Sequence, residues 1–170
     1  DDPRRHRRRA TDLMQTERPT AIIADDEPQL CAFLRRQLGQ CWPELSILEE
    51  AHNGRKALDI IDEFHPDIAF LDIKMPVLSG LEVAGRMATP CHVVFVTAYD
   101  QYAVQAFESA AVDYLLKPVS RERLEKTVAR LRSCLAKEPP DLSQLIVKLS
   151  EQLRSKAGYL QWLQTSFQNE

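Results

Sequence analysis

The chain has 170 residues, a formal net charge of -3 at pH 7, 44% apolar residues and 28% charged residues. This size and composition predict one ordinary globular domain with a real core and some additional chain. No apolar run is long enough for a membrane span, and no signal-peptide core follows the N-terminal arginines, so we expect a cytoplasmic protein without membrane contact. Residues 17–132 carry thirteen basic and eighteen acidic side chains, which argues against electrostatic binding of nucleic acid by this region.

Short apolar runs alternate with segments of helical period from residue 19 onward. The sequence predicts five strands, at residues 20–24, 45–50, 68–71, 92–96 and 112–116. Between and after them, apolar residues recur at spacings of three and four, which predicts helices at 28–38, 57–64, 79–87, 102–110 and 120–135. Pro28 is tolerated in the first turn of a helix, Pro66 ends the second helix, and Ser120 is a good N-cap. This alternation implies an α/β fold with a doubly wound, parallel five-stranded sheet.

The chain continues beyond the last predicted strand and helix. Pro139-Pro140 breaks it, and a sixth amphipathic helix is then predicted from residues at spacings of three and four, namely Leu142, Leu145, Ile146, Leu149 and Leu153. Its apolar stripe needs a partner, which is either the domain itself or the same helix of another subunit. Gly158 ends this helix.

The four cysteines and the N-terminal arginines give weaker signals. Cys31, Cys41, Cys91 and Cys134 form no CxxC pair, so we expect reduced residues that mostly fill the core. The basic run at residues 4–9 has the charge to contact an acidic partner or phosphates, but we favour a disordered, solvated tail.

Polar residues follow or close four of the predicted strands. The acidic pair Asp25-Asp26 follows the first strand, Asp72 the third, Thr97 the fourth and Lys117 the fifth. Because the carboxyl ends of parallel strands meet at one edge of a sheet, we expect these side chains to converge there. A single aspartate at a strand end is usually a helix cap or a turn residue, but the joint spacing of all five residues is improbable by chance.

Three carboxylates, a hydroxyl and an ammonium group at one sheet edge predict a site for a divalent cation and a phosphoryl group. An oxygen-only ligand set suits Mg2+, which takes one or two carboxylates and keeps several waters. Thr97 can hydrogen-bond a phosphoryl oxygen, and Lys117 supplies a point charge that neutralises phosphate oxygens. Asp72 is the predicted nucleophile toward phosphorus, since it follows the most apolar strand and precedes a loop with backbone carbonyls able to reach a metal.

Four segments carry a resemblance to a known family. They are IADDEP (23–28), LDIKMP (71–76) with Ser79-Gly80, FVTAY (95–99) and DYLLKP (113–118). These segments resemble the receiver domain of bacterial two-component response regulators, and the resemblance covers about residues 19–136. It implies a flavodoxin-like fold and transfer of a phosphoryl group from a sensor histidine kinase to Asp72.

The resemblance also assigns a metal site and catalytic residues. It implies Mg2+ held by Asp26, Asp72 and the backbone carbonyl of Lys74, with Asp25 acting through water. Asp72 would be the phosphoacceptor, assisted by Lys117. The family pattern has a cis peptide bond after this lysine.

Four residues are expected to control the response. Thr97 and Tyr114 carry over as the switch pair, in which the hydroxyl turns toward the phosphoryl group and the aromatic ring moves inward behind it. Lys74 and Tyr99, each two residues beyond a site residue, flank the expected path of hydrolytic water and are predicted to set the lifetime of the phosphoryl group.

Within that family, the stretches 97–108 and 113–119 are similar to the receivers of LytR/AlgR-type regulators. Those regulators carry a C-terminal LytTR DNA-binding domain built mostly of β-strands, and residues 159–163 resemble the approach to it. We therefore expect a basic tail at 1–18, a receiver domain at 19–137, and at 138–170 a linker helix with the start of a truncated LytTR domain. The resemblance implies transcription regulation through DNA contacted only by that domain, and we expect a homodimer formed through the 101–132 face and the 142–156 helix.

Functions of other classes fit the sequence less well. A haloacid-type phosphatase also uses an Asp nucleophile with Mg2+, but it needs a second Asp where this chain has Lys74. A flavin carrier of similar fold needs a Gly or Ser/Thr phosphate-binding cluster that the first loop lacks. A stand-alone receiver acting through protein–protein interaction or phosphorelay stays open, although the striped helix after Pro140 argues against it. We do not expect the chain to be an enzyme, although it is expected to catalyse its own phosphorylation and dephosphorylation.

Overall fold

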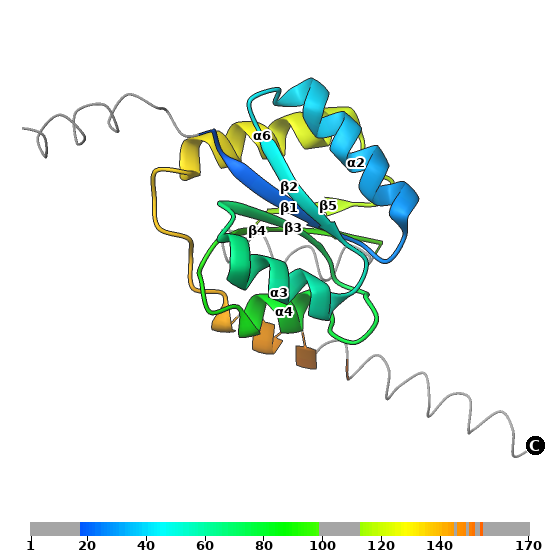
Figure 1. Cartoon of the computed structure of the whole chain (residues 1–170), viewed down its shortest axis with the longest axis vertical. Coiled ribbons are helices and arrows are strands. Elements are labelled where there is room, and N and C mark those ends of the chain that lie inside the picture. Colours follow the sequence, from blue (N-terminus) through cyan, green and yellow to red (C-terminus); the bar gives the residue numbers. More distant parts are fainter. Residues whose placement is uncertain (1–17, 99–112, 145, 149, 152–153, 155–170) are drawn as a thin grey trace, which may run out of the picture.

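The computed structural model describes residues 18–98, 113–144, 146–148, 150–151 and 154. Within them, five parallel strands form one sheet in the order β2-β1-β3-β4-β5 (Figure 1). The strands are β1 (Thr20–Ala24), β2 (Ser46–Ala51), β3 (Ile68–Asp72), β4 (His92–Thr97) and β5 (Asp113–Leu116). This order is that of flavodoxin-like doubly wound folds and confirms the predicted fold class.

Helices cover both faces of the sheet. In the described part of the chain, α2 (Pro28–Cys41) and α6 (Arg121–Cys134) lie on one face, and α3 (Gly54–Phe64) and α4 (Gly80–Arg86) on the other (Figure 1). The helix predicted at 102–110 lies outside the described residues, as do the tail at 1–17 and residues 155–170.

Several predicted boundaries differ from the structure by one to three residues. β2 begins at Ser46 because the N–H of Leu45 donates to the carbonyl of Trp42 in a turn (3.1 Å). α2 runs past Leu38 to Cys41, since the buried indole of Trp42 packs into the core and its backbone N–H donates to the carbonyl of Leu38 (2.7 Å). The apolar stripe used for the prediction stops one turn before this closing contact.

The helices begin where the sequence places capping residues. Asn53 accepts from the N–H of Lys56 and caps α3, and Ser120 accepts from the N–H of Arg123 and caps α6. Ser79 and Glu82 form a reciprocal capping box at the start of α4. Each cap satisfies N–H groups that have no partner within the helix, which fixes the start of that helix relative to the preceding strand.

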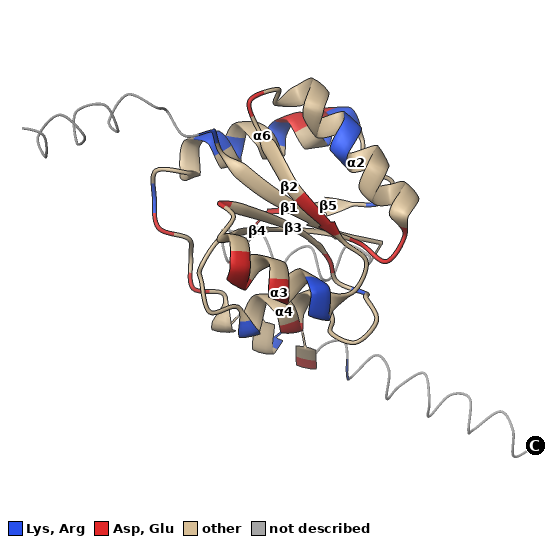
Figure 2. Cartoon of the chain, in the orientation of Figure 1, with Lys and Arg blue, Asp and Glu red and all other residues tan. Residues whose placement is uncertain are grey.

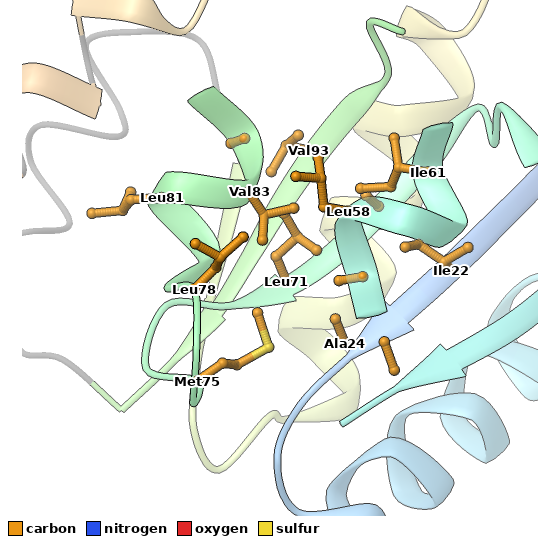
Figure 3. Packing of buried hydrophobic residues seen from close by; sticks show 14 of the residues in the cluster. Ile22, Ala24, Leu58, Ile61, Leu71, Met75, Leu78, Leu81, Val83 and Val93 are labelled. Carbon is orange, nitrogen blue, oxygen red and sulfur yellow. The ribbon is translucent and has the colours of Figure 1, made fainter. Parts of the chain in front are cut away.

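The hydrophobic core has one part on each face of the sheet. Apolar residues of α2 and α6 pack on one face with Ile23, Phe70 and Val94 from the strands. On the other face, α3 and α4 pack on Ile22 and Leu71 (Figure 3). The strands β3 and β4 are buried along their whole length, as their nearly continuous apolar sequence predicts.

The loop between β3 and α4 is fixed against neighbouring backbone. Met75 and Leu78 point from this loop into the core (Figure 3). A Cβ atom on Gly54 would overlap the carbonyl of Leu78, and one on Gly80 would overlap the carbonyl of Asp72. Val77 lies between the anchors at φ 71°, a left-handed backbone that β-branched residues rarely adopt, and it is 75% exposed. The loop that follows the predicted phosphoacceptor is therefore held tightly in one position.

The cysteines behave as predicted. All four are free, with Cys31 and Cys91 buried and Cys41 and Cys134 half-buried. Burial raises the pKa of the Cys31 and Cys91 thiols to about 12, so both are inert core residues at neutral pH. In the part of the chain that the structure describes, no helix combines the length and the apolar content needed to cross a membrane.

Candidate functional site at the carboxyl edge of the sheet

The predicted site residues converge at the carboxyl edge of the sheet. Asp25 follows β1, Asp72 ends β3, Thr97 ends β4 and Lys117 follows β5. β1 and β3 are neighbours, and the strand order reverses at β1, which is where ligands bind in open α/β sheets. The loop between β1 and α2 carries three consecutive acidic residues and is coloured red in Figure 2.

Lys117 joins two of the aspartates. Its Nζ lies 2.7 Å from Oδ2 of Asp25 and 2.9 Å from Oδ2 of Asp72. Its backbone N–H donates to the carbonyl of Thr97 (2.8 Å), which fixes the end of β5 against the end of β4. The Lys117–Pro118 bond is cis, as the family pattern implied.

The second oxygen of each aspartate accepts from the backbone. Oδ1 of Asp25 accepts from the N–H of Glu27 (2.9 Å), and Oδ1 of Asp72 accepts from the N–H of Lys74 (3.2 Å). Both aspartates are buried, at 4% and 5% exposure. The two carboxylates are thus oriented by one lysine and by the loops that follow their own strands.

Burial and charge act in opposite directions on this cluster. Burial raises the pKa of Asp72 above its ordinary value, and the charge of Asp25 adds to this, while Lys117 and the N–H of Lys74 oppose it. Burial alone would lower the pKa of Lys117, but its hydrogen bonds and ion pairs with Asp25 and Asp72 outweigh burial and raise that pKa. Lys117 is therefore a permanent cation at neutral pH, shared between two negative groups.

A cavity of about 430 Å3 opens beside the cluster. Its lining combines acidic, basic and hydroxyl side chains, from Asp26, Glu27, Asp72, Lys74, Thr97, Ala98 and Lys117. Thr97 is almost fully buried, whereas Asp26, Glu27 and Lys74 are exposed. Five of the predicted residues line the cavity, namely Asp26, Asp72, Lys74, Thr97 and Lys117. Asp25 is not among the lining residues, but its carboxylate pairs with Lys117.

The donor set at this cavity fits a hard divalent cation. One carboxylate oxygen from each of Asp25, Asp26 and Glu27 lies within 4.8 Å of the other two. Asp72 and the loop carbonyls that follow it are further oxygen donors, and no His or Cys is among them, which suits Mg2+. Glu27 was not singled out from the sequence, although its place directly after Asp25-Asp26 was a usable signal.

The predicted switch residue Tyr114 lies away from the cavity. It is half-buried on β5, packs against the α3–α4 part of the core, and has the Arg123 guanidinium 5.2 Å from its ring centroid. Arg123 also donates to the carbonyl of Tyr114 (3.1 Å) and to Oδ1 of the buried Asp113 (2.7 Å). Arg130 reaches the same oxygen at 3.3 Å. Sequence reasoning missed this Asp113–arginine cluster, because pairing between β5 and α6 leaves no local pattern.

The two residues predicted to set the lifetime of the phosphoryl group are Lys74 and Tyr99. Lys74 is exposed at the rim of the cavity, where its role in the lifetime of a phosphoryl group stays a prediction. Tyr99 lies outside the described residues.

On α6, Arg121–Glu125 and Glu122–Lys126 are ion pairs one turn apart with exposed side chains, which is typical of a solvated helix face.

This fold and this arrangement of side chains are those of a receiver domain, and the chain belongs to that family. Residues 21–129 match the response regulator receiver domain. The receiver domain of a response regulator, AraT from Geobacillus stearothermophilus, superposes with a TM-score of 0.60 at 29% identity, over 70% of this chain and 96% of that one. The signal receiver domain of NarL from Mycobacterium tuberculosis gives a TM-score of 0.59 at 27% identity, over 72% and 99%.

Among individual proteins, the chain is similar to regulatory proteins of Vibrio cholerae and Escherichia coli. An uncharacterized response regulatory protein of Vibrio cholerae is 43% identical over 160 residues, which is 90% of this chain and 61% of that protein. The transcriptional regulatory protein BtsR of Escherichia coli K12 is 44% identical over 128 residues, 71% of this chain and 51% of BtsR. The chain thus spans between half and three fifths of the length of these relatives.

Proposed function

We propose that this domain accepts a phosphoryl group from a sensor histidine kinase onto Asp72, with Mg2+ as cofactor. The observation that carries the proposal is the contact of one lysine with two buried aspartates at the wall of an acidic cavity. An isolated structural ion pair would need one carboxylate. The additional carboxylates of Asp26 and Glu27 give the site more negative charge than Lys117 balances, and this favours a bound cation.

The proposed transfer uses the chain's own groups in defined roles. An oxygen of Asp72 attacks phosphorus and forms the acyl phosphate, while the phosphorus–nitrogen bond to the donor imidazole breaks and that nitrogen keeps the electron pair. Asp26, Asp72 and the carbonyl of Lys74 would hold Mg2+, with Asp25 acting through water, and the bound ion would offset the repulsion between the carboxylates and the incoming phosphoryl group. Lys117 can then pair with a phosphoryl oxygen in place of the Asp72 oxygen.

The proposed response starts at Thr97 and ends at an output surface. Its hydroxyl would turn to a phosphoryl oxygen, and Tyr114 would move inward behind it. We further propose that the whole protein is a cytoplasmic transcription regulator of LytR/AlgR type. In that protein, phosphorylation would favour a homodimer through the 101–132 face and the 142–156 helix and would position a LytTR DNA-binding domain. The similarity to a transcriptional regulatory protein, BtsR, supports this class of output.

Acetyl phosphate tests the proposed phosphoacceptor. With Mg2+, the protein is expected to gain the mass of one phosphoryl group, and the Asp72→Asn variant is expected to gain none. Asp59→Asn is the control, because Asp59 is an exposed aspartate whose ion-pair partner, Arg55, is also exposed. Equal labelling of the parent protein and Asp72→Asn would remove Asp72 from the proposal, and an unlabelled parent protein would remove the proposal itself.

The pH dependence of stability tests the electrostatics without any phosphodonor. Because burial raises the pKa of Asp72 above 3.8, the metal-free folded protein binds this proton more readily than the unfolded chain. The contribution of Asp72 to stability therefore falls as pH rises from about that ordinary value through the raised pKa. We expect urea unfolding to show that the unfolding free energy of the parent protein falls relative to that of Asp72→Asn across this window. We also expect Mg2+ to stabilise the parent protein more than the variant at neutral pH. An unchanged difference across the window would contradict this.

A further inference from the structure

The backbone carbonyl of Asp25 is held by side chains from two other elements. Nδ1 of His52 lies 3.1 Å from this carbonyl oxygen, and Sγ of Cys31 lies 3.6 Å from it. His52 directly follows β2, and Cys31 lies in the first turn of α2. A carbonyl oxygen has two lone pairs, so the two donors use its full capacity. They therefore fix the backbone at the start of the acidic loop, residues 25–27.

The acceptor identifies the hydrogen on each donor. Because a carbonyl oxygen only accepts, Nδ1 of His52 must carry a hydrogen, and the neutral ring is the Nδ1–H tautomer. Burial raises the pKa of the Cys31 thiol to about 12, so the thiol keeps its hydrogen at neutral pH and can donate. His52 is exposed, so its ring is oriented by this hydrogen bond and not by burial in the core.

The other polar groups of Asp25 are bonded as well. Its N–H donates to the carbonyl of Ala51, the last residue of β2 (3.0 Å). Its Oδ1 accepts from the N–H of Glu27 (2.9 Å), and its Oδ2 pairs with Lys117 (2.7 Å). Asp25 is thus fixed at its backbone by the end of β2 and at its carboxylate by its own loop and Lys117.

The held carbonyl also sets the direction of the residues that follow. The peptide unit is planar, and in its trans form the C=O and the next N–H point in opposite directions, so fixing the carbonyl of Asp25 fixes the N–H of Asp26. Asp26 and Glu27 line the acidic cavity, whereas His52 contacts the loop from outside the described lining. The hydrogen bond from His52 therefore restricts how these two carboxylates enter the cavity.

We propose that His52 is a positioning residue for the divalent-cation site, which orients Asp26 and Glu27 through the backbone carbonyl of Asp25. The role rests on the proposed function, since it needs Mg2+ at this site. His52 would act on the carboxylates through the backbone and would not itself bind the ion, because its Nδ1–H is used by the carbonyl.

Mg2+ affinity measured by NMR titration tests this role. The backbone N–H signals of Glu27 and Lys74 are the reporters, because both groups donate to aspartates of the site. His52→Leu is expected to weaken Mg2+ binding about 10-fold, the lower end of the usual cost of losing a group that orients metal ligands. Loss of any positive charge on the ring would strengthen Mg2+ binding instead. His52→Asn should recover the parent affinity, since its amide nitrogen is attached to Cγ, as Nδ1 is in histidine.

His65→Leu is the matched control for lost stability. Nδ1 of His65 lies 2.8 Å from Oγ1 of Thr89, at the end of α3 that is remote from the site. His65 also has a left-handed backbone (φ 49°), so this variant should lose at least as much stability as His52→Leu and keep the parent Mg2+ affinity. Parent affinity in His52→Leu, or equal weakening in His52→Asn or His65→Leu, would overturn the positioning role and leave the proposed function intact. A parent protein that binds no Mg2+ would overturn both.

The tautomer of His52 gives a second readout that needs no metal. In alkaline solution, where imidazoles are neutral, 15N NMR is expected to show the hydrogen of this ring on Nδ1. A hydrogen on Nε2 instead would show that the bond to the carbonyl of Asp25 is not made, and the positioning role would be wrong.

Discussion

A Lys117→Met variant is expected to lose about 3 to 5 kcal/mol of unfolding free energy at neutral pH without divalent cations, the usual cost of removing one partner of a buried ion pair. The lysine side chain is 16% exposed and contacts Asp25 and Asp72, whose side chains are 6% and 7% exposed. Removing it leaves two buried carboxylates that face each other without a cation. Denaturant unfolding measures the loss.

An exposed lysine provides the matched control. Lys126 is 70% exposed and pairs with Glu122 at 3.8 Å, so Lys126→Met should leave stability almost unchanged. If Lys117→Met unfolds like Lys126→Met, the carboxylates are already protonated or hydrated, and the described ion pairs are not an important part of this site. Added Mg2+ should recover part of the loss in Lys117→Met, since a cation among the carboxylates replaces some of the missing positive charge.

A Gly80→Ala variant is expected to lose about 3 kcal/mol of unfolding free energy, at the upper end of the usual cost of overpacking. The added methyl group would overlap the backbone carbonyl of Asp72, which cannot rotate away as a flexible side chain would. To fold, the variant must shift either the start of α4 or the end of β3. We therefore also expect slower labelling by acetyl phosphate, because the phosphoacceptor carboxylate is displaced.

Gly39 provides the opposite case within the same chain. It lies inside α2, and a Cβ there would meet no atom within 4 Å. Gly39→Ala should raise the unfolding free energy by about 0.5 to 1 kcal/mol, because alanine loses less conformational freedom in a helix. Equal effects of the two substitutions would show that close packing on Asp72 does not govern the first.

The strand-end residues were predictable because a parallel sheet converts sequence spacing into proximity. Asp25, Asp72 and Lys117 are separated from one another by at least 45 positions in the sequence. Each of them follows or ends an apolar run, and the fold brings the ends of these runs together. Helix starts at Ser79 and Ser120 were also readable, since capping depends on residues a few positions away, whereas α3 begins at Gly54, three residues before its predicted start.

Contacts between distant elements were not predictable in the same way. The pairing of Asp113 with Arg123 and Arg130 depends on how α6 lies along β5, and no local pattern encodes it. The apolar stripe after Pro140 showed that the linker needs a partner, but a stripe of this kind fits a domain surface or a second subunit equally well. The burial of Leu142 comes from the path of the intervening chain.

The most direct test of the account is to identify the residue that carries the phosphoryl group. An acyl phosphate is reduced by borohydride, so an aspartyl phosphate leaves homoserine at its position, which peptide mass spectrometry locates. After treatment with acetyl phosphate and Mg2+, we expect homoserine at position 72 and at no other aspartate. Homoserine at Asp25 or Asp26 instead, or labelling that is equally strong without a divalent cation, would contradict the assignment of this site.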